Sequence, residues 1–232
     1  MKRIVALTGV VTLLSSAAVA QSSAVGLVNQ AVARAGGRLA LETNQVLEWR
    51  GKATIHIPNR TIEIAGEWEV QPDSAIVTTW PIEQPGDPRR LILSRLGGWT
   101  QRGAASPTPM SPELLVEERH QFYLYQLLRL VPLLDGGFTL AIMPGDSHQV
   151  GLRISHPDHP DVTLYFDDQH RVVELRTVFA APDMTQPESQ EIHLSGETQS
   201  RDVRWFRELR ILRGGKPYFD LEITDFRASP HR

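Results

Sequence analysis

The chain has 232 residues, no cysteine, and 24 basic residues against 27 acidic ones, for a formal net charge of −3 at pH 7. This mildly acidic balance lacks the basic patch that nucleic-acid binding needs, so we expect no nucleic-acid partner. Without cysteine the protein has no disulfide framework, no thiol catalysis and no lipid-modified cysteine, and a hydrophobic core must stabilise the fold unaided.

The first twenty residues predict a cleaved signal peptide. A basic start at Lys2 and Arg3 precedes an apolar run over residues 4–14, and Ala18-Val19-Ala20 gives the small-x-small pattern that signal peptidase reads. The run is shorter than the roughly 20 apolar residues that span a bilayer, so we expect a soluble exported product with no stable membrane anchor. The mature chain would carry 22 basic and 27 acidic residues, a net charge of −5.

The mature chain opens with a predicted helix and continues with predicted strands. Apolar residues recur at helical spacing over residues 24–35, and Gly36-Gly37 follows as a stop signal. The period then changes to two, which is typical of strands with one buried face. Four strands are expected at residues 46–57, 62–70, 76–80 and 90–96. Short turns between them predict an antiparallel meander.

A second helix is predicted to begin after Ser111, which suits the N-cap, with Pro112 at the first helical position and Glu113 in the first turn. It runs to about Val131. Its bulky apolar positions are Leu114, Leu115, Phe122, Tyr125, Leu127, Leu128 and Val131. So wide an apolar surface predicts a helix that packs across a sheet or lies in a concave surface.

Strands are predicted to resume after this helix. Their expected ranges are 138–142, 149–155, 162–166, 172–179, 190–194, 205–212 and 217–224. With the first meander this makes about eleven strands and two or three helices. The fold class is therefore α+β and mainly antiparallel, with the helices on one face of a long sheet.

Candidate catalytic and metal-binding residues are few. The segment His156-Pro157-Asp158-His159-Pro160-Asp161 holds two imidazoles and two carboxylates, which would suit zinc in a hydrolase, but the spacing matches no zinc pattern and a solvated turn is favoured. Glu117, Glu118 and His120 lack the spacing of a metallopeptidase and are assigned to a polar helix face. The sequence carries no phosphate-binding glycine loop or dinucleotide motif, so we expect no cofactor, no metal and no enzyme activity.

A signal peptide, a short helix ending in Gly-Gly, strands of the form Trp49-Arg50-Gly51-Lys52-Ala53, a mid-chain helix and a second long run of strands follow one another along the chain. This order resembles the LolA/LolB lipoprotein-carrier superfamily of Gram-negative envelopes, and residues 118–130 and 161–167 resemble uncharacterised exported relatives. The resemblance implies one periplasmic domain over residues 21–232. It would form an incomplete, half-open β-barrel whose concave apolar face is covered by helices and holds the acyl chains of a lipid or lipoprotein.

On this hypothesis the protein is a non-catalytic carrier or sensor. The expected cavity-lining residues are Trp49, Trp68, Trp80, Trp99, Phe122, Tyr125 and Leu128. Such large side chains also suit an ordinary core, so the alternative is an interaction or sensory module with a filled interior, no lipid ligand and an envelope protein as partner. Carriers of this family have an arginine that helps to gate the pocket, and Arg50 is the candidate by its place in an early strand. The sequence does not decide which face of that strand is concave.

Overall fold

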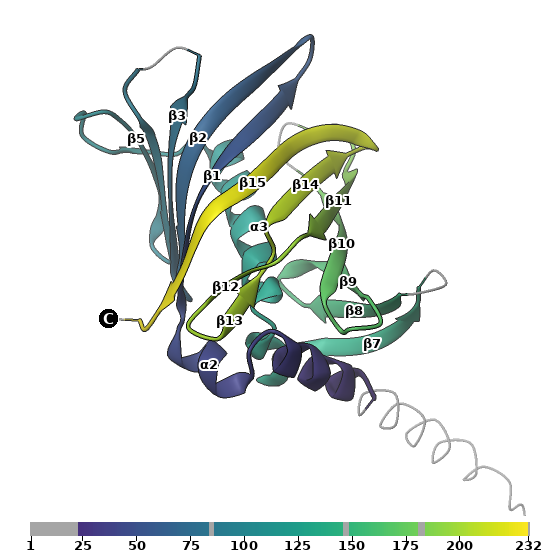
Figure 1. Ribbon diagram of the computed structural model, residues 1–232. Helices are drawn as coiled ribbons and strands as arrows, with labels where there is room; N and C mark the ends of the chain where they lie inside the picture. The colour runs from purple at the N-terminus through teal and green to yellow at the C-terminus, as the bar shows by residue number, and fades with distance from the viewer. Residues whose placement is uncertain (1–22, 84–85, 146–148, 181–183, 232) are drawn as a thin grey trace, which may run out of the picture.

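The computed structural model describes residues 23–83, 86–145, 149–180 and 184–231 (Figure 1). The expected signal peptide at residues 1–20 lies outside this part of the chain. A single antiparallel sheet of thirteen strands forms most of the described structure, and a separate two-stranded ribbon is inserted near its centre.

Two helices precede the sheet. The first covers residues 23–34 and buries Ala24, Val28 and Val32 on one face, close to the predicted apolar stripe. After the predicted Gly-Gly stop a second helix begins, α2 (Arg38–Thr43), which the sequence did not single out. Gly36 is required at the junction because it adopts a φ of 130° and a Cβ there would lie 2.0 Å from the carbonyl oxygen of Asp202.

Several strands alternate between more and less buried side chains, as expected for a sheet with one face on the core. Those of the large sheet are β1 (Val46–Ile57), β2 (Arg60–Val70), β3 (Ser74–Pro81), β4 (Arg89–Ser94), β5 (Gly97–Arg102), β6 (Thr108–Pro109), β7 (Thr139–Pro144), β8 (Val150–His156), β9 (His159–Phe166), β10 (Val172–Phe179), β11 (Glu188–Ser195), β14 (Glu208–Arg213) and β15 (Lys216–Ser229). The small ribbon consists of β12 (Thr198–Ser200) and β13 (Val203–Trp205).

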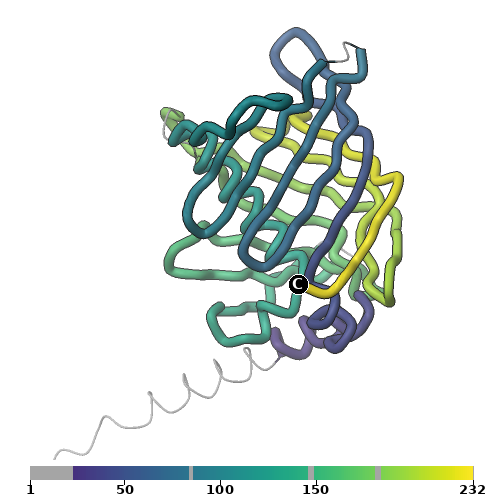
Figure 2. Tube along the Cα trace, turned by 90° about the vertical axis from the view of Figure 1, so that its left-hand side faces the viewer, coloured from purple at the N-terminus to yellow at the C-terminus, as the bar shows by residue number. Residues whose placement is uncertain are grey.

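The chain builds the large sheet as two meanders that meet at its centre. The first runs outward from β1 to β6 at one edge. Helix α3 (Pro112–Leu128) and the 3₁₀ helix η1 (Val131–Leu134) then lead to β7 at the other edge, from which the second meander returns to β15. β15 pairs with β1 and joins the two meanders. The sheet curls into an open half-barrel with α3 inside the curve (Figures 1 and 2).

The predicted fold class is confirmed, and the differences are local. Strands β5 and β6 and the β12–β13 ribbon add to the predicted set, and the single strand expected at residues 205–212 is divided between β13 and β14. Helix α3 ends at Leu128 and not at Val131, because Leu130 adopts a φ of 64° and Pro132 lies in the 3₁₀ turn that follows.

Candidate functional site

Helix α3 is the element that turns the concave face of the sheet into an enclosed space. Ser111 caps it as predicted, and its side chain accepts a hydrogen bond from the Leu114 N–H at 3.3 Å. Farther along, the Gln126 side-chain amide donates to the Gln71 carbonyl at 2.8 Å and ties the helix to the β2–β3 turn. Tyr123 and Tyr125, on different faces of α3, are both buried, so protein surrounds this half of the helix.

A cavity of about 230 Å³ lies between α3 and the first half of the sheet, and we call it the α3 cavity. Its walls come from β1 to β4, β14, β15, α3 and Met110 just before it. The residues that line it are Ile55, Ile64, Trp68, Val70, Ala75, Val77, Thr79, Arg89, Leu91, Leu93, Met110, Leu114, Glu117, Glu118, Gln121, Phe122, Tyr125, Ile211, Arg213, Tyr218 and Phe219. Most are apolar, as in pockets that bind apolar ligands.

The strand register gives the α3 cavity two different ends. At one end Val70 pairs with Ala75, which pairs with Leu93, so three apolar side chains form a floor. At the other end Thr79 pairs with Arg89, and the charged residues of the lining gather at this mouth. The cavity is therefore amphipathic along its length.

The Trp68 ring can lie against the sheet and line the cavity because Gly66, next to it, has no side chain. A Cβ at Gly66, two residues earlier on the same strand face, would lie 2.5 Å from the end of the Trp68 ring. The ring of Trp68 also stacks with that of Trp49 opposite it on β1, with centroids 6.4 Å apart and planes 8° from parallel. Gly66 thus lets an indole lie flat on the sheet beside the cavity.

The mouth contains a hydrogen-bonded ion pair between α3 and the end of the sheet. Arg213 Nη1 donates to Glu117 Oε1 at 2.9 Å, and the Tyr218 hydroxyl donates to the same oxygen at 2.7 Å. Arg213 Nε donates to the buried Gln190 side chain at 3.0 Å. The guanidinium lies between two rings, 3.6 Å from the centroid of Tyr218 and 4.1 Å from that of Phe179. These contacts hold Arg213 in one orientation.

Glu118 is a second carboxyl group at the mouth, next to this ion pair. Burial raises its pKa to about 7, the negative charge of Glu117 adds to the increase, and Arg89 and Arg213 oppose it. The sequence assigned Glu117 and Glu118 to a polar helix face. In the structure both line the α3 cavity, and burial makes the Glu118 carboxyl group harder to ionise than a free one.

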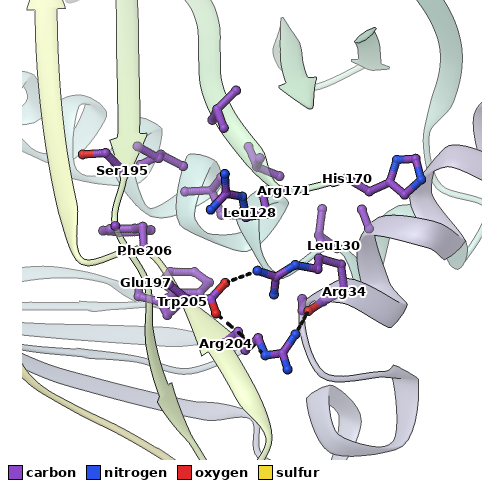
Figure 3. A pocket seen from close by; sticks show the side chains of 16 residues that line it. Arg34, Leu128, Leu130, His170, Arg171, Ser195, Glu197, Arg204, Trp205 and Phe206 are labelled. Atoms are coloured by element: carbon purple, nitrogen blue, oxygen red, sulfur yellow. Dashed lines mark hydrogen bonds and ion pairs between the residues drawn. The ribbon is translucent and has the colours of Figure 1, made fainter. Parts of the chain in front are cut away.

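A second cavity of about 250 Å³ lies at the other end of α3, and we call it the lower cavity (Figure 3). It is bounded by the first helix, Leu128 and Leu130, and strands β10, β11 and β13. Arg34 and Arg204 share the carboxylate of Glu197, at 2.6 and 3.8 Å, and Arg204 also donates to the Arg34 carbonyl. The polar side of this cavity is thus largely satisfied by its own ion pairs.

Trp49 separates the two cavities. Its ring centroid lies 5.4 Å from that of Tyr125 and 6.4 Å from that of Trp68, which both line the α3 cavity. On its other side it lies 6.1 Å from Trp205 and 6.5 Å from Phe206, which both line the lower cavity. Trp49 itself is 2% exposed. Five aromatic rings therefore form a partition across the interior.

The candidate metal segment His156 to Asp161 forms the β8–β9 turn, as expected of a solvated turn. His156 Nδ1 accepts a hydrogen bond from the Asp158 N–H at 3.2 Å. The His159 ring stacks on Tyr123 of α3, with centroids 3.9 Å apart. The centroids of the two imidazole rings lie 5.2 Å apart and Asp158 is exposed, and within the described residues this segment does not bring three ligand-type atoms within 4.8 Å of one another.

Within the described residues a different trio brings three ligand-type atoms within 4.8 Å of one another: Glu174, Glu191 and His193. Glu174 already forms an ion pair with Arg176, whose guanidinium also lies 4.7 Å from the Tyr165 ring centroid. The carboxylate charge is thus neutralised within the sheet, and we assign no metal to this trio.

No family model and no curated protein matches the sequence. Solved structures match its fold over most of its length. A putative outer membrane lipoprotein-sorting protein domain from Vibrio parahaemolyticus has a TM-score of 0.58 at 9% identity, covering 90% of this chain and 93% of the other. A DUF1329 family protein from Desulfovibrio piger has a TM-score of 0.58 at 10% identity, with 88% and 92% covered. A LolA superfamily protein from Nitrosomonas europaea has a TM-score of 0.56 at 8% identity, with 90% and 94% covered.

The protein has a LolA-like fold. The resemblance inferred from the order of elements is confirmed at this level, and identities of 8–10% carry the comparison no further than the fold. Among the described residues, no helix is both long and apolar enough to cross a membrane.

Within this LolA-like fold the seven predicted lining residues separate into groups. Trp68, Phe122 and Tyr125 line the α3 cavity, and Leu128 lines the lower cavity. Trp49 belongs to the partition. Trp80 on β3 and Trp99 on β5 are half-buried and line neither cavity. Which of these residues contact a ligand stays a prediction.

Arg50 lies on the outer face of the LolA-like half-barrel. Its side chain is 67% exposed and pairs with Glu67 at 2.9 Å, while Trp49, on the other face of β1, points to α3. Arg50 and the α3 cavity thus lie on opposite sides of the sheet, and a gating role for Arg50 stays a prediction. The arginine held inside the cavity mouth is Arg213, which the sequence analysis did not single out.

Proposed function

We propose that the protein is an exported, non-catalytic binding protein that holds an acyl chain in the α3 cavity, as a carrier or sensor in the periplasm. The observation that carries the proposal is an apolar-floored cavity beneath the helix that covers the concave face of a LolA-like half-barrel. Each methylene that leaves water for such a site contributes about 0.8 kcal/mol, so one chain gives useful affinity without specific polar contacts.

Two of the fold neighbours support this assignment. One is described as a putative outer membrane lipoprotein-sorting protein domain and another as a LolA superfamily protein. The predicted signal peptide supports export. The alternative, an interaction module with a filled interior, is less favoured because the chain leaves two cavities inside the half-barrel.

A cavity-filling substitution tests the proposal with a matched control one residue away. Val77 lines the α3 cavity, whereas its neighbour Ile76 lies on the outer face of β3, near Arg50 and Glu67. We expect delipidated wild-type protein to bind a fluorescent fatty acyl probe, Val77→Trp to bind it much more weakly, and Ile76→Trp to bind it like the wild type. Absence of binding by the folded wild-type protein, or equal binding by Val77→Trp, would overturn the proposal.

A further inference from the structure

We propose that the α3 cavity selects a single-chain amphiphile with an anionic head group, such as a long-chain carboxylate, with the chain toward Trp68 and the head group at Arg89 and Arg213. This inference rests on the proposed function and deepens it, because it names the ligand class and its orientation. It is carried by the size of the cavity, its polarity along one axis, and the hydrogen-bond donors at its mouth.

The size of the α3 cavity limits the number of chains. Pockets for drug-sized ligands usually span about 300 to 1,000 Å³. The α3 cavity, at about 230 Å³, lies below that range. The α3 cavity and the lower cavity share no lining residue, so the lower cavity does not extend the α3 cavity. One chain fits this volume, and the several chains of a diacyl or triacyl lipid do not.

The polarity of the cavity fixes the direction of the ligand. Val70, Ala75 and Leu93 form the floor, whereas Thr79 and Arg89 lie at the mouth on the same strands. An amphiphile buries its chain on the floor and leaves its head group at the mouth, since the reverse orientation would desolvate a polar group without partners.

The mouth offers donors to an anionic head group. The hydrogen bonds of Arg213 to Glu117 and Gln190 use its Nη1 and Nε atoms and leave Nη2 for another acceptor. Gln121 lines the cavity, and its side-chain amide is buried beside Tyr125. Arg89 is exposed at the rim. Two guanidinium groups and an amide thus line the cavity and are available as donors to a carboxylate.

The charges at the mouth favour the same ligand. Arg213 and Glu117 neutralise each other, and Arg89 brings a further positive charge. Glu118 faces another carboxylate, Glu117 of α3, and two guanidinium groups. These belong to Arg89 of β4 and Arg213 of β14. The phenol groups of Tyr125 and Tyr218 lie nearby. A ligand that fills the cavity removes water from Glu118 and favours its neutral form, which can donate a hydrogen bond to a carboxylate.

Three amphiphiles with the same chain test the head-group preference. Dodecanoate, dodecanol and dodecyltrimethylammonium are titrated into delipidated protein at pH 7, below their micellar concentrations, by displacement of a fluorescent acyl probe. We expect dodecanoate to bind about tenfold more tightly than dodecanol, because one charge-assisted hydrogen bond typically contributes about that much to affinity. The ammonium compound should bind most weakly.

Two neighbouring arginines provide the matched variants. Arg89 lies at the cavity mouth, and Arg90 lies on the outer face of the same strand. Arg89→Gln should reduce the affinity for dodecanoate about threefold or more and leave that for dodecanol unchanged. Arg90→Gln should change neither.

The outcomes separate the inference from the proposed function. Equal binding of the three amphiphiles, or tightest binding of the ammonium compound, would overturn the head-group assignment while leaving acyl-chain binding intact. Equal effects of Arg89→Gln and Arg90→Gln would overturn the placement of the head group. Failure of all three amphiphiles to bind would overturn the proposed function itself.

Discussion

The indole of Trp49 on β1 meets the phenol ring of Tyr125 on α3 nearly edge-on, with centroids 5.4 Å apart and planes at 67°. This contact joins the centre of the sheet to the helix that covers it. Trp49 also contacts Trp205 and Phe206, which line the lower cavity, so its ring lies between the linings of the two cavities. The length of chain that the protein accepts should therefore depend on this one side chain.

Trp49→Ala removes the partition between the two cavities. We expect the free energy of unfolding to fall by about 3–5 kcal/mol, because a fully buried aromatic ring is lost and a larger cavity remains. The variant should also shift its preference toward longer acyl chains. Denaturant unfolding and a chain-length series measure the two effects. Trp80→Ala, at a half-buried position that lines neither cavity, should cost less stability and leave the chain-length preference unchanged.

Gly66→Ala places a methyl group against the ring of Trp68 and forces the indole to move. We expect a loss of stability of about 1–3 kcal/mol, the usual cost of overpacking, together with weaker binding of an acyl probe. Gly137→Ala is the control, because a Cβ at Gly137 meets no atom within 4 Å. If both variants bind the probe like the wild type, the Trp68 ring does not shape the binding site.

Glu118 should make the stability of the protein depend on pH. Its pKa rises from 4.5 to about 7 on folding, so between these values the folded state keeps a proton that the unfolded chain has lost. Stability contributed by this group is therefore present below pH 4.5 and falls as the pH rises to about 7, by up to about 3 kcal/mol. Glu118→Gln removes this dependence and should become increasingly more stable than the wild type between pH 5 and pH 8.

His120 changes the unfolding free energy with pH in the opposite direction to Glu118. The effect of Glu118 alone is therefore measured as the difference in unfolding free energy between Glu118→Gln and the wild type. Burial, followed by the positive charge of Arg213, lowers the pKa of His120 to about 4, and this part of the stability increases as the pH rises from 4 to 6.5. Unfolding free energies measured at several pH values test both the decrease in stability with pH that comes from Glu118 and the increase that comes from His120. A constant difference between Glu118→Gln and the wild type would contradict the placement of Glu118 in the cavity wall.

The ion pair of Glu117 and Arg213 should be strongly coupled. Both side chains are mostly buried and share hydrogen bonds with Tyr218 and Gln190, so removal of one partner leaves the other unpaired. In a double-mutant cycle of Glu117→Gln and Arg213→Gln we expect a coupling energy of about 1–3 kcal/mol. The exposed pair Arg50 and Glu67 should give less than about 1 kcal/mol in the same measurement.

Local sequence patterns predicted most of the elements but not the way they assemble. The alternation over β1 and β2 and the Ser111 cap of α3 each depend on a few adjacent residues, and they were predicted correctly. The pairing of β1 with β15 joins strands from the two ends of the described chain, and no local pattern encodes it. Strands β5 and β6 were missed because glycine, proline and polar residues mask their alternation.

The candidate site was predicted only in part for a similar reason. Trp68, Phe122 and Tyr125 were identified because large aromatic residues suit the inside of a half-barrel. Arg213 and Tyr218 lie 96 and 101 residues from Glu117, so only the folded chain brings the mouth together. The sequence placed Arg50 in an early strand, which the structure confirms, but it did not identify the concave face of that strand.

The most direct test of acyl-chain binding in the α3 cavity is photo-crosslinking with a fatty acid that carries a diazirine near the end of its chain. The modified residue within each peptide is then located by fragment-ion mass spectrometry. We predict labelling of Trp68 on β2 and of Phe122 or Tyr125 on α3, and loss of this labelling in Val77→Trp. Labelling of outer-face residues around Glu67 and Ile76, or none in the folded wild-type protein, would contradict the proposal.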